Sequence, residues 1–526
     1  MFTTARTSGG RTVRGGALAV VAVAALALSA CSGTSSNGAK SAASDTLTVA
    51  LTTPPISMDP TAAGNGIPLI WYMNLAYEPL IKRDVDGTAK PGLATDWKYS
   101  SDRLTFTMNL RKGVQFSDGS ALTADAVVAW LKHYKEKGQF AAWLANVTDI
   151  TASGPLAVTL KLSTPDPLLP YGFDQGGVAG DIVAPAGLEN GGKSLGTETF
   201  GAGPYMLDKK ATIANSSYVF VKNPHYYLKS QQHYKKVVLK VITDQNSILS
   251  ALRSGQVQVA QGSATNAAAA KKAGLNVTSA PSGMVGMYIA DQNGQIAPAL
   301  KDVRVRQALN YAIDRKSITK TLYGDYGTPT TQYVPKEIPG YVASLEDVYP
   351  YDPAKAKALL KEAGYAKGFS FSLLEQPGVD SGDQLAQAMV AQWKAIGVNV
   401  TLKNIPAFAD YVNAAVSKKY AATTLTFNYS VQLVDTQQLT TFPAVYNFLG
   451  FKDAKANALA TAQRKFDLDS PEGKTAAEAS ETYMVQNAFA VPVASVGSVI
   501  FSAKSVTGVD YTPYPWPNPS NWKPAN

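Results

Sequence analysis

Cysteine and histidine are scarce in this sequence. Among 526 residues, cysteine occurs once, histidine occurs three times, and charged residues make up 17% of the chain. A single cysteine excludes an internal disulfide. The histidines are His133, His225 and His233, and no HxxxH or HExxH spacing occurs, so the sequence contains no recognisable zinc motif. We therefore expect no metal site and no cofactor.

A dense block of lysine and arginine is also missing. The net charge of +9 is spread along the chain, and such a distribution makes nucleic acid an unexpected partner. No GxSxG nucleophile motif is present, and no pair of acidic residues stands out as an acid–base pair. The residues therefore give no support for an enzyme.

One segment matches the phosphate-binding pattern GxxxxGK[ST]. It is GLENGGKS, residues 187–194. A phosphate loop requires a buried strand before it and a helix after it, so that backbone amides converge on the phosphate. Here Ala184-Pro185-Ala186 precedes the segment, and glycines at 196, 201 and 203 follow it. We therefore predict a surface turn and no nucleotide site.

The N-terminus has the features of an export signal. Three arginines precede an apolar or small run at residues 17–30, which ends in Leu28-Ser29-Ala30-Cys31. The run is shorter than the roughly 20 residues that span a bilayer, and it suits the core of a signal peptide. Its end resembles the bacterial lipobox, in which the cysteine thiol receives diacylglycerol. The alternative is an ordinary signal peptide followed by a chance cysteine.

These features predict a mature protein held at a membrane by a lipid on Cys31. Residues 1–30 form the predicted signal peptide, and the small, polar residues 31–44 form a flexible tether. Loss of the three N-terminal arginines lowers the net charge to +6. No other apolar run approaches membrane-spanning length, so the lipid is the expected contact with the membrane.

The length of the chain predicts at least two hydrophobic cores. Its clearest local pattern covers residues 369–403, where two alternating strands flank a helix ended by Gly397. This βαβ unit implies a parallel strand pair with a right-handed crossover, and hence α/β lobes. The buried face of its helix is predicted from the spacing of Leu385, Met389, Trp393 and Ile396.

Two further helices carry start signals. Thr123 is placed to cap a helix that follows it, and Asp352 with Pro353 supplies a cap and a first-turn proline. Residues 104–110 alternate between apolar and polar side chains, as in a half-buried strand.

A series of short motifs runs in a fixed order through the mature chain. In sequence order they are Tyr77-Glu78-Pro79-Leu80, Pro91-Gly92-Leu93-Ala94, Leu110-Arg111-Lys112-Gly113-Val114, Phe116-Ser117-Asp118-Gly119, Gly201-Ala202-Gly203-Pro204-Tyr205, and Asp302 to Leu309 followed by Ala312-Ile313-Asp314-Arg315. In these motifs the sequence resembles family 5 of the bacterial extracellular solute-binding proteins, the peptide and nickel-complex receptors of ATP-binding-cassette (ABC) importers. Arg306 and Asp314 are expected to form ion pairs that fix a helix.

The resemblance implies a fold and its domains. The fold is an α/β, two-lobe clamp like the periplasmic binding proteins, of type II and of the large variety with three subdomains. Lobe one would comprise residues 45–282, with an inserted subdomain at 81–199, and would be completed by 495–526. Lobe two would comprise 283–494. In this family the ligand binds between the lobes, and closure buries it.

The resemblance also implies a function without catalysis. The chain would be the substrate-binding lipoprotein of an ABC importer, a monomer that captures peptides and delivers them to the permease and ATPase subunits. It would lie outside the cytoplasm, lipid-anchored to the cell membrane on its periplasmic side or outer face. The alternatives are another cargo, such as a metal chelate or an oligosaccharide, and a surface lipoprotein used for sensing. No arginine lies between Arg315 and Arg464, which favours longer or varied peptides over strict dipeptides.

One aspartate is the candidate anchor for the ligand's α-ammonium group. Peptide-binding members of the family use an aspartate in a stretch resembling W-x-A-D-Y-x-x-P-x-x-F, and the corresponding residue here is Asp435. Its spacing to Phe442 agrees with that pattern, although Gln432 and Thr436 replace the tryptophan and the tyrosine, and leucine replaces the proline. The alternative role for Asp435 is to cap a turn.

Two aromatic residues lie just upstream of this aspartate. Phe427 and Tyr429 are candidates for the walls of the ligand site. Core packing is the alternative for Phe427.

Overall fold

The computed structural model describes residues 45–63, 69–84, 88–375, 382–405, 408–424, 426–428, 433–434, 436, 439, 447–511 and 517–525. The predicted signal peptide, the tether and Cys31 lie outside these ranges, so the export and lipidation signals stay predictions. Within the ranges, no helix has both the length and the apolar character needed to cross a membrane.

The strands are β1 Thr46–Leu51, β2 Ile81–Arg83, β3 Ala89–Pro91, β4 Ala94–Tyr99, β5 Thr105–Leu110, β6 Val147–Gly154, β7 Ala157–Leu162, β8 Tyr205–Leu207, β9 Ser217–Lys222, β10 Lys236–Val241, β11 Val259–Gly262, β12 Asn276–Ile289, β13 Gly327–Pro329, β14 Phe369–Glu375, β15 Val398–Asn404, β16 Ala422–Thr424, β17 Phe427–Asn428, β18 Ala490–Ser502, β19 Val506–Thr507 and β20 Lys523–Pro524. The helices are α1 Leu69–Ala76, α2 Ala124–Lys137, α3 Leu169–Gly172, α4 Gln245–Arg253, α5 Ala267–Lys272, α6 Val303–Tyr311, α7 Arg315–Tyr323, α8 Pro353–Glu362, α9 Gly382–Ala395, α10 Phe408–Val416, α12 Ala454–Gln463 and α13 Pro471–Gln486.

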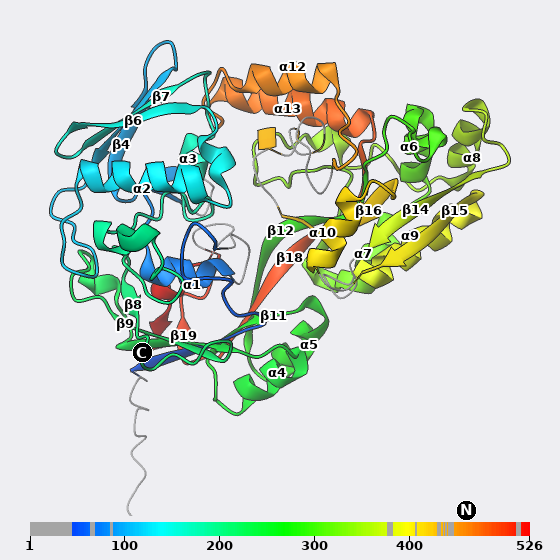
Figure 1. Ribbon diagram of the computed structural model, residues 1–526. Helices are drawn as coiled ribbons and strands as arrows, with labels where there is room; N and C mark the ends of the chain where they lie inside the picture. The colour runs from blue at the N-terminus through cyan, green and yellow to red at the C-terminus, as the bar shows by residue number, and fades with distance from the viewer. Residues whose placement is uncertain are drawn as a thin grey trace, which may run out of the picture. The chain divides into compact units, whose positions relative to one another are not determined.

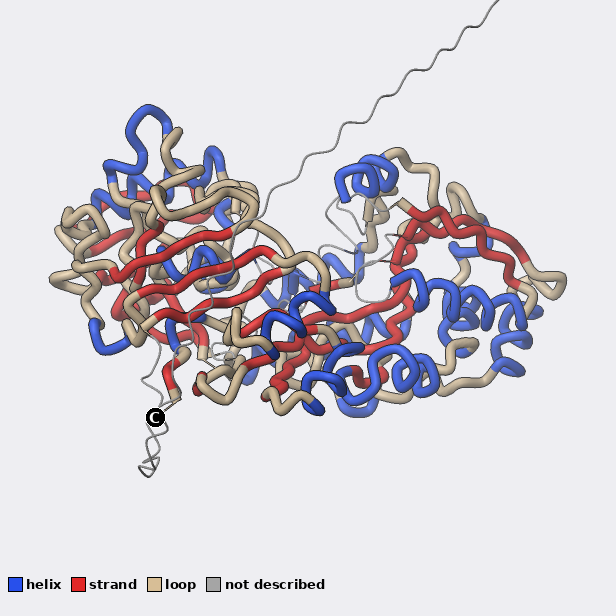
Figure 2. Tube along the Cα trace, turned by 90° about the horizontal axis from the view of Figure 1, so that it is seen from below, coloured by secondary structure: helices blue, strands red, loops and turns tan. Residues whose placement is uncertain are grey.

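One sheet of twelve strands runs through most of the fold. Its order is β15-β14-β16-β12-β18-β11-β1-β10-β9-β8, with β13 paired to β18 and β17 paired to β12. The long strands β12 and β18, which we call the hinge strands, pair antiparallel from Asn276 opposite Ser502 to Tyr288 opposite Ala490. Figure 1 shows this pair in the middle of the sheet, with further strands on both sides. Figure 2 shows the strands of the fold in red, seen from below.

The two largest hydrophobic cores belong to different parts of the chain. The first, which defines lobe one, gathers side chains from β1 to β11 and from the C-terminal segment. There Trp522 packs edge-on against Trp71 of α1, with 5.2 Å between ring centroids. The second core, which defines lobe two, gathers side chains from β12 to β18. The described C-terminal segment therefore returns to the lobe that contains β1.

Lobe one contains a separate four-stranded sheet in the order β4-β5-β7-β6. Helix α2 packs beside it and begins where the sequence predicted, because the Thr123 side chain accepts a hydrogen bond from the Ala126 amide. The helix is held to the rest of the lobe by Trp130, whose indole N–H donates to the Ala179 carbonyl oxygen at 3.0 Å. Strand β5 alternates as predicted, with Phe106 and Met108 fully buried.

The predicted βαβ unit forms the outer part of lobe two. Strands β14 and β15 pair in parallel from Phe369 opposite Val398 to Glu375 opposite Asn404, and α9 connects them. The four predicted apolar positions are all buried, three of them in α9 and the fourth directly after it. Gly397 ends the connection with φ of +90°, a left-handed conformation that glycine adopts without strain.

The structure corrects one expectation and confirms another. Neither Arg306 nor Asp314 forms an ion pair with a described residue. Arg306 instead donates hydrogen bonds to backbone carbonyl oxygens, including that of Asn487 at 2.9 Å, and Asp314 caps α7. The phosphate-loop pattern lies in a 3₁₀ turn, Pro185–Gly191, and the following residues form further turns, as predicted.

Candidate functional site

The predicted ligand residues belong to a segment that the structure describes only in part. Asp435 and Tyr429 lie outside the described residues, so their roles stay predictions. The backbone of Phe427 is placed in β17, where it pairs with Met284 of the hinge strand β12. Strand β17 therefore lies beside the hinge strand β12, and the side-chain role of Phe427 stays a prediction too.

The two lobes touch through charged pairs at α12 and α13. Arg103, in the turn before β5, donates from Nη2 to Oδ1 of Asp467 at 2.8 Å. In the opposite sense, Arg464 at the end of α12 lies 3.4 Å from Oδ1 of Asp166 in lobe one. Each lobe therefore supplies one cation and one anion to the contact.

Apolar side chains accompany these charges. The buried ones are Leu168, Leu433, Ala460 and Leu468, and the partly buried ones are Trp143, Tyr171 and Val434. Tyr171 of lobe one also donates a hydrogen bond to Asp469 of lobe two at 3.2 Å. Together with the two charged pairs, these residues form what we call the interlobe contact.

A buried ion pair holds Tyr171 in place. The guanidinium of Arg83 stacks on the Tyr171 ring, 3.3 Å from its centroid. The Arg83 Nε also donates to Asp174 at 2.5 Å, with both side chains almost fully buried. Stacking and pairing fix the guanidinium plane, so lobe one offers a rigid surface to lobe two at this point.

The carboxyl ends of two neighbouring strands in lobe two carry buried polar groups. Glu375 ends β14, Thr424 ends β16, and the two residues are direct neighbours in the parallel pair. Burial, aided by the charge of Asp383, raises the pKa of the Glu375 carboxyl above its ordinary value. Sequence reasoning missed both residues. The sequence did contain one signal for a buried glutamate, because Glu375 directly follows the apolar pair Leu373-Leu374 of the expected strand.

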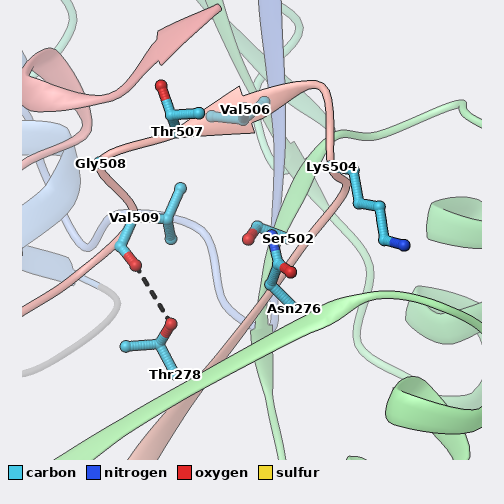
Figure 3. A pocket seen from close by; sticks show the side chains of 8 residues that line it. All are labelled: Asn276, Thr278, Ser502, Lys504, Val506, Thr507, Gly508 and Val509. Atoms are coloured by element: carbon cyan, nitrogen blue, oxygen red, sulfur yellow. Dashed lines mark hydrogen bonds between the residues drawn. The ribbon is translucent and has the colours of Figure 1, made fainter. Parts of the chain in front are cut away.

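A shallow pocket of about 400 Å³ lies on the lobe-one end of the hinge strands. Figure 3 shows its lining residues, among them Thr278, whose hydroxyl donates to the Val509 carbonyl oxygen at 3.1 Å. Lys504 is the one charged residue in the lining. None of its lining residues belongs to the interlobe contact, and we take the region between the lobes as the candidate site.

The described residues contain no group of three or more His, Cys, Asp or Glu side chains arranged to hold a metal ion.

Known proteins resemble this chain in sequence and in fold. Residues 88–448 match the family described as bacterial extracellular solute-binding proteins, family 5 Middle. The glutathione-binding protein GsiB of Salmonella paratyphi A is 32% identical over 336 residues, which are 62% of this chain and 63% of that protein. The matched region thus spans less than two thirds of that relative.

Solved structures share the fold at lower sequence identity. The binding protein AgaA from A. tumefaciens R10, in complex with agropinic acid, has a TM-score of 0.76 and 24% identity, covering 91% of this chain and 99% of its own. A dipeptide-binding protein from Pseudoalteromonas sp. SM9913, in complex with Met-Leu, has a TM-score of 0.77 and 19% identity, covering 91% of this chain and all of its own. The fold is therefore the α/β, two-lobe clamp of these binding proteins.

The family comprises substrate-binding proteins of transport systems, which are not enzymes. Because the family match covers more than half of the sequence, this chain belongs to the bacterial extracellular solute-binding proteins of family 5.

Proposed function

We propose that this chain is the substrate-binding protein of an ABC importer and that it captures peptides between its lobes. The observation that carries the proposal is the family match over residues 88–448. The interlobe contact supports it, because a clamp acts by favouring one relative position of its lobes when ligand bridges them. Catalytic turnover has no place in this function.

Peptide is the favoured cargo because two similar proteins are described with peptide ligands. They are the glutathione-binding relative and the Met-Leu complex. Peptide receptors obtain affinity from main-chain hydrogen bonds and tolerate varied side chains. The agropinic acid complex favours a second candidate, the same transport role with a non-peptide solute.

We further propose that the mature protein is anchored outside the cytoplasm through Cys31 and works with permease and ATPase subunits. The lobes would divide at residues 282/283 and 494/495. The N-terminal signal and the extracellular family support the location, and the two separate cores support the division.

Asp435 is the proposed anchor of the peptide's α-ammonium group. A closing cleft removes water from the ammonium, and a carboxylate must replace that water. Asp435→Asn should therefore weaken peptide binding by roughly 2–5 kcal/mol, because the ammonium is left buried without a counter-charge. Calorimetry with free and N-acetylated peptides measures this loss, and acetylation should weaken binding to the wild type similarly.

The control is Asp410→Asn, which alters an exposed carboxylate in the first turn of α10 and should leave affinity unchanged. A thermal-shift screen comes first, because a ligand at a hundredfold excess over its Kd stabilises the fold by about 2.7 kcal/mol. Equal affinity for free and acetylated peptides would remove Asp435 from the site. Stabilisation by non-peptide solutes alone would favour the second candidate.

A further inference from the structure

The strand order in lobe two reverses at one point. The chain leaves β14, passes through α9 and adds β15 on one side of β14. It then passes through α10 and adds β16 on the other side, giving the order β15-β14-β16 with all three strands parallel. Figure 1 shows these strands side by side, with α9 and α10 beside them. In open α/β sheets, ligands bind at the carboxyl ends of the strands where the order reverses.

Two buried polar side chains occupy this switch point. Glu375 and Thr424 are the last residues of β14 and β16, and they are 0% and 4% exposed. Among the described residues, neither carboxylate oxygen of Glu375 has a hydrogen-bond partner. The Thr424 hydroxyl has none either. Burial of a carboxylate without a hydrogen-bond partner destabilises the fold. A group that donates hydrogen bonds to Glu375 would remove this destabilisation.

The surroundings of Glu375 add negative charge and, among the described residues, no cation that pairs with it. Asp383 lies in the first turn of α9, and Asn404 ends the neighbouring strand β15. From α10, the Tyr411 hydroxyl is already hydrogen-bonded to the Thr423 side chain and to the Thr424 carbonyl oxygen. No described lysine or arginine forms an ion pair with Glu375. The chemistry that fits is therefore a cationic donor supplied from outside the chain.

We propose that Glu375 and Thr424 form a cation subsite in lobe two, which binds an ammonium or guanidinium group of the ligand. The proposal rests on the solute-binding function proposed above and narrows its substrate class to solutes that carry such a group. An alkylammonium has three donors, and a guanidinium has five. Either group can engage both carboxylate oxygens of Glu375 and the Thr424 hydroxyl at once. The cation can be a lysine or arginine side chain of the peptide, or its α-ammonium group if Glu375 anchors that group in place of Asp435.

The test is calorimetry with four versions of one peptide, with the N-terminus free or acetylated and with a central arginine or citrulline. Putrescine and agmatine serve as non-peptide probes. Glu375→Gln keeps the shape but removes the charge, and it should weaken binding of the cationic probes at least tenfold. Thr424→Val should weaken binding of the same probes less than Glu375→Gln does. The matched control is Asp181→Asn, which changes an equally buried, partnerless carboxylate in lobe one and should leave affinity unchanged.

The pattern of losses identifies the cation. A loss confined to arginine peptides assigns the subsite to a side chain, and a loss confined to free N-termini assigns it to the α-ammonium. Binding of the amines but of no peptide would end the peptide function and keep the subsite. Two results overturn the subsite: unchanged affinity of Glu375→Gln for every cationic probe, or a wild type that binds none of them.

Thermal melts of the ligand-free variants separate binding from folding. Glu375→Gln should melt at the wild-type temperature or above it, because the variant buries an amide in place of a carboxylate. An affinity loss accompanied by a large drop in melting temperature would show a structural role and overturn the proposal.

Discussion

Asp181 is the clearest case in lobe one of a residue whose surroundings oppose its charge. Its side chain is 1% exposed, and neither carboxylate oxygen has a hydrogen-bond partner among the described residues. Burial first, and then the negative charges of Asp174 and Glu78, raise the pKa of the Asp181 carboxyl well above its ordinary value. The folded protein therefore favours the protonated form of this side chain.

This shift predicts how stability depends on pH. Below the ordinary carboxyl pKa the group is protonated in both states and contributes nothing to the difference. As pH rises through that pKa, the unfolded state releases the proton first and the folded state loses relative stability, until the raised pKa is passed. Asp181→Asn should therefore match the wild type near pH 4 and exceed it increasingly toward neutral pH. Denaturant unfolding of both proteins from pH 4 to 8 measures the difference, and a constant difference would contradict it.

Local signals at single residues could be predicted from the sequence, and buried charge could not. Thr123, the Asp352-Pro353 pair and Gly397 act within a few residues of their own position, so their caps and turns were predicted correctly. The burial of Asp181 and Glu375 depends on side chains far away in the sequence. The apolar pair before Glu375 is a weak local signal, and only the assembled core reveals that both carboxyl groups are buried.

Helices α12 and α13 bring lobe two against lobe one through the interlobe contact. Of its two charged pairs, Arg464–Asp166 is the more enclosed, because the side chains are 19% and 4% exposed, whereas Asp467 in the other pair is 66% exposed. An exposed ion pair stabilises a contact only slightly, and a pair that is shielded from water stabilises it more. Asp166 also accepts a hydrogen bond from Asn146 at 2.6 Å, so it keeps a partner when Arg464 is changed.

Arg464→Ala should therefore weaken ligand binding several-fold without touching the ligand, because it destabilises the position in which the lobes meet. Arg103→Ala should have a smaller effect. Calorimetry gives the affinities, and small-angle scattering at half-saturating ligand should show less compaction for Arg464→Ala than for the wild type.

The control for this change is Lys209→Ala, which breaks a 2.7 Å pair with Glu198 inside lobe one and should change neither measurement. If Arg464→Ala binds ligand as tightly as the wild type, the interlobe contact has no part in closure.

At the scale of elements, the sequence predicted neighbours along the chain better than neighbours in space. The βαβ unit around α9 was predicted because its three elements are consecutive and each has a clear period. The interlobe contact was not predicted, since it joins the turn before β5 to the segment between α12 and α13, 364 residues away. Charges on such surfaces follow no local rule.

The whole molecule is expected to depend on one residue for its attachment to the membrane. Cys31→Ser should release the protein from membranes or block removal of residues 1–30, because serine lacks the thiol that accepts the lipid. Membrane fractionation followed by intact mass measurement tests this expectation. A variant that stays in the membrane fraction with the mature mass of the wild type would show that Cys31 is not the anchor.

The order in which this protein is synthesised conflicts with the order in which its sheet can be completed. Strand β11 pairs with β18, with Val259 opposite Ser502. In the same lobe, Trp71 packs against Trp522, which is near the end of the described chain. Strand β11 cannot pair with β18 until the roughly 240 residues between Val259 and Ser502 have emerged, whether from the ribosome or across the membrane. During that interval the β11 edge is unpaired, a state that invites pairing with other chains. The βαβ unit of lobe two needs only its own consecutive residues, so the lobe that is made first is the one finished last.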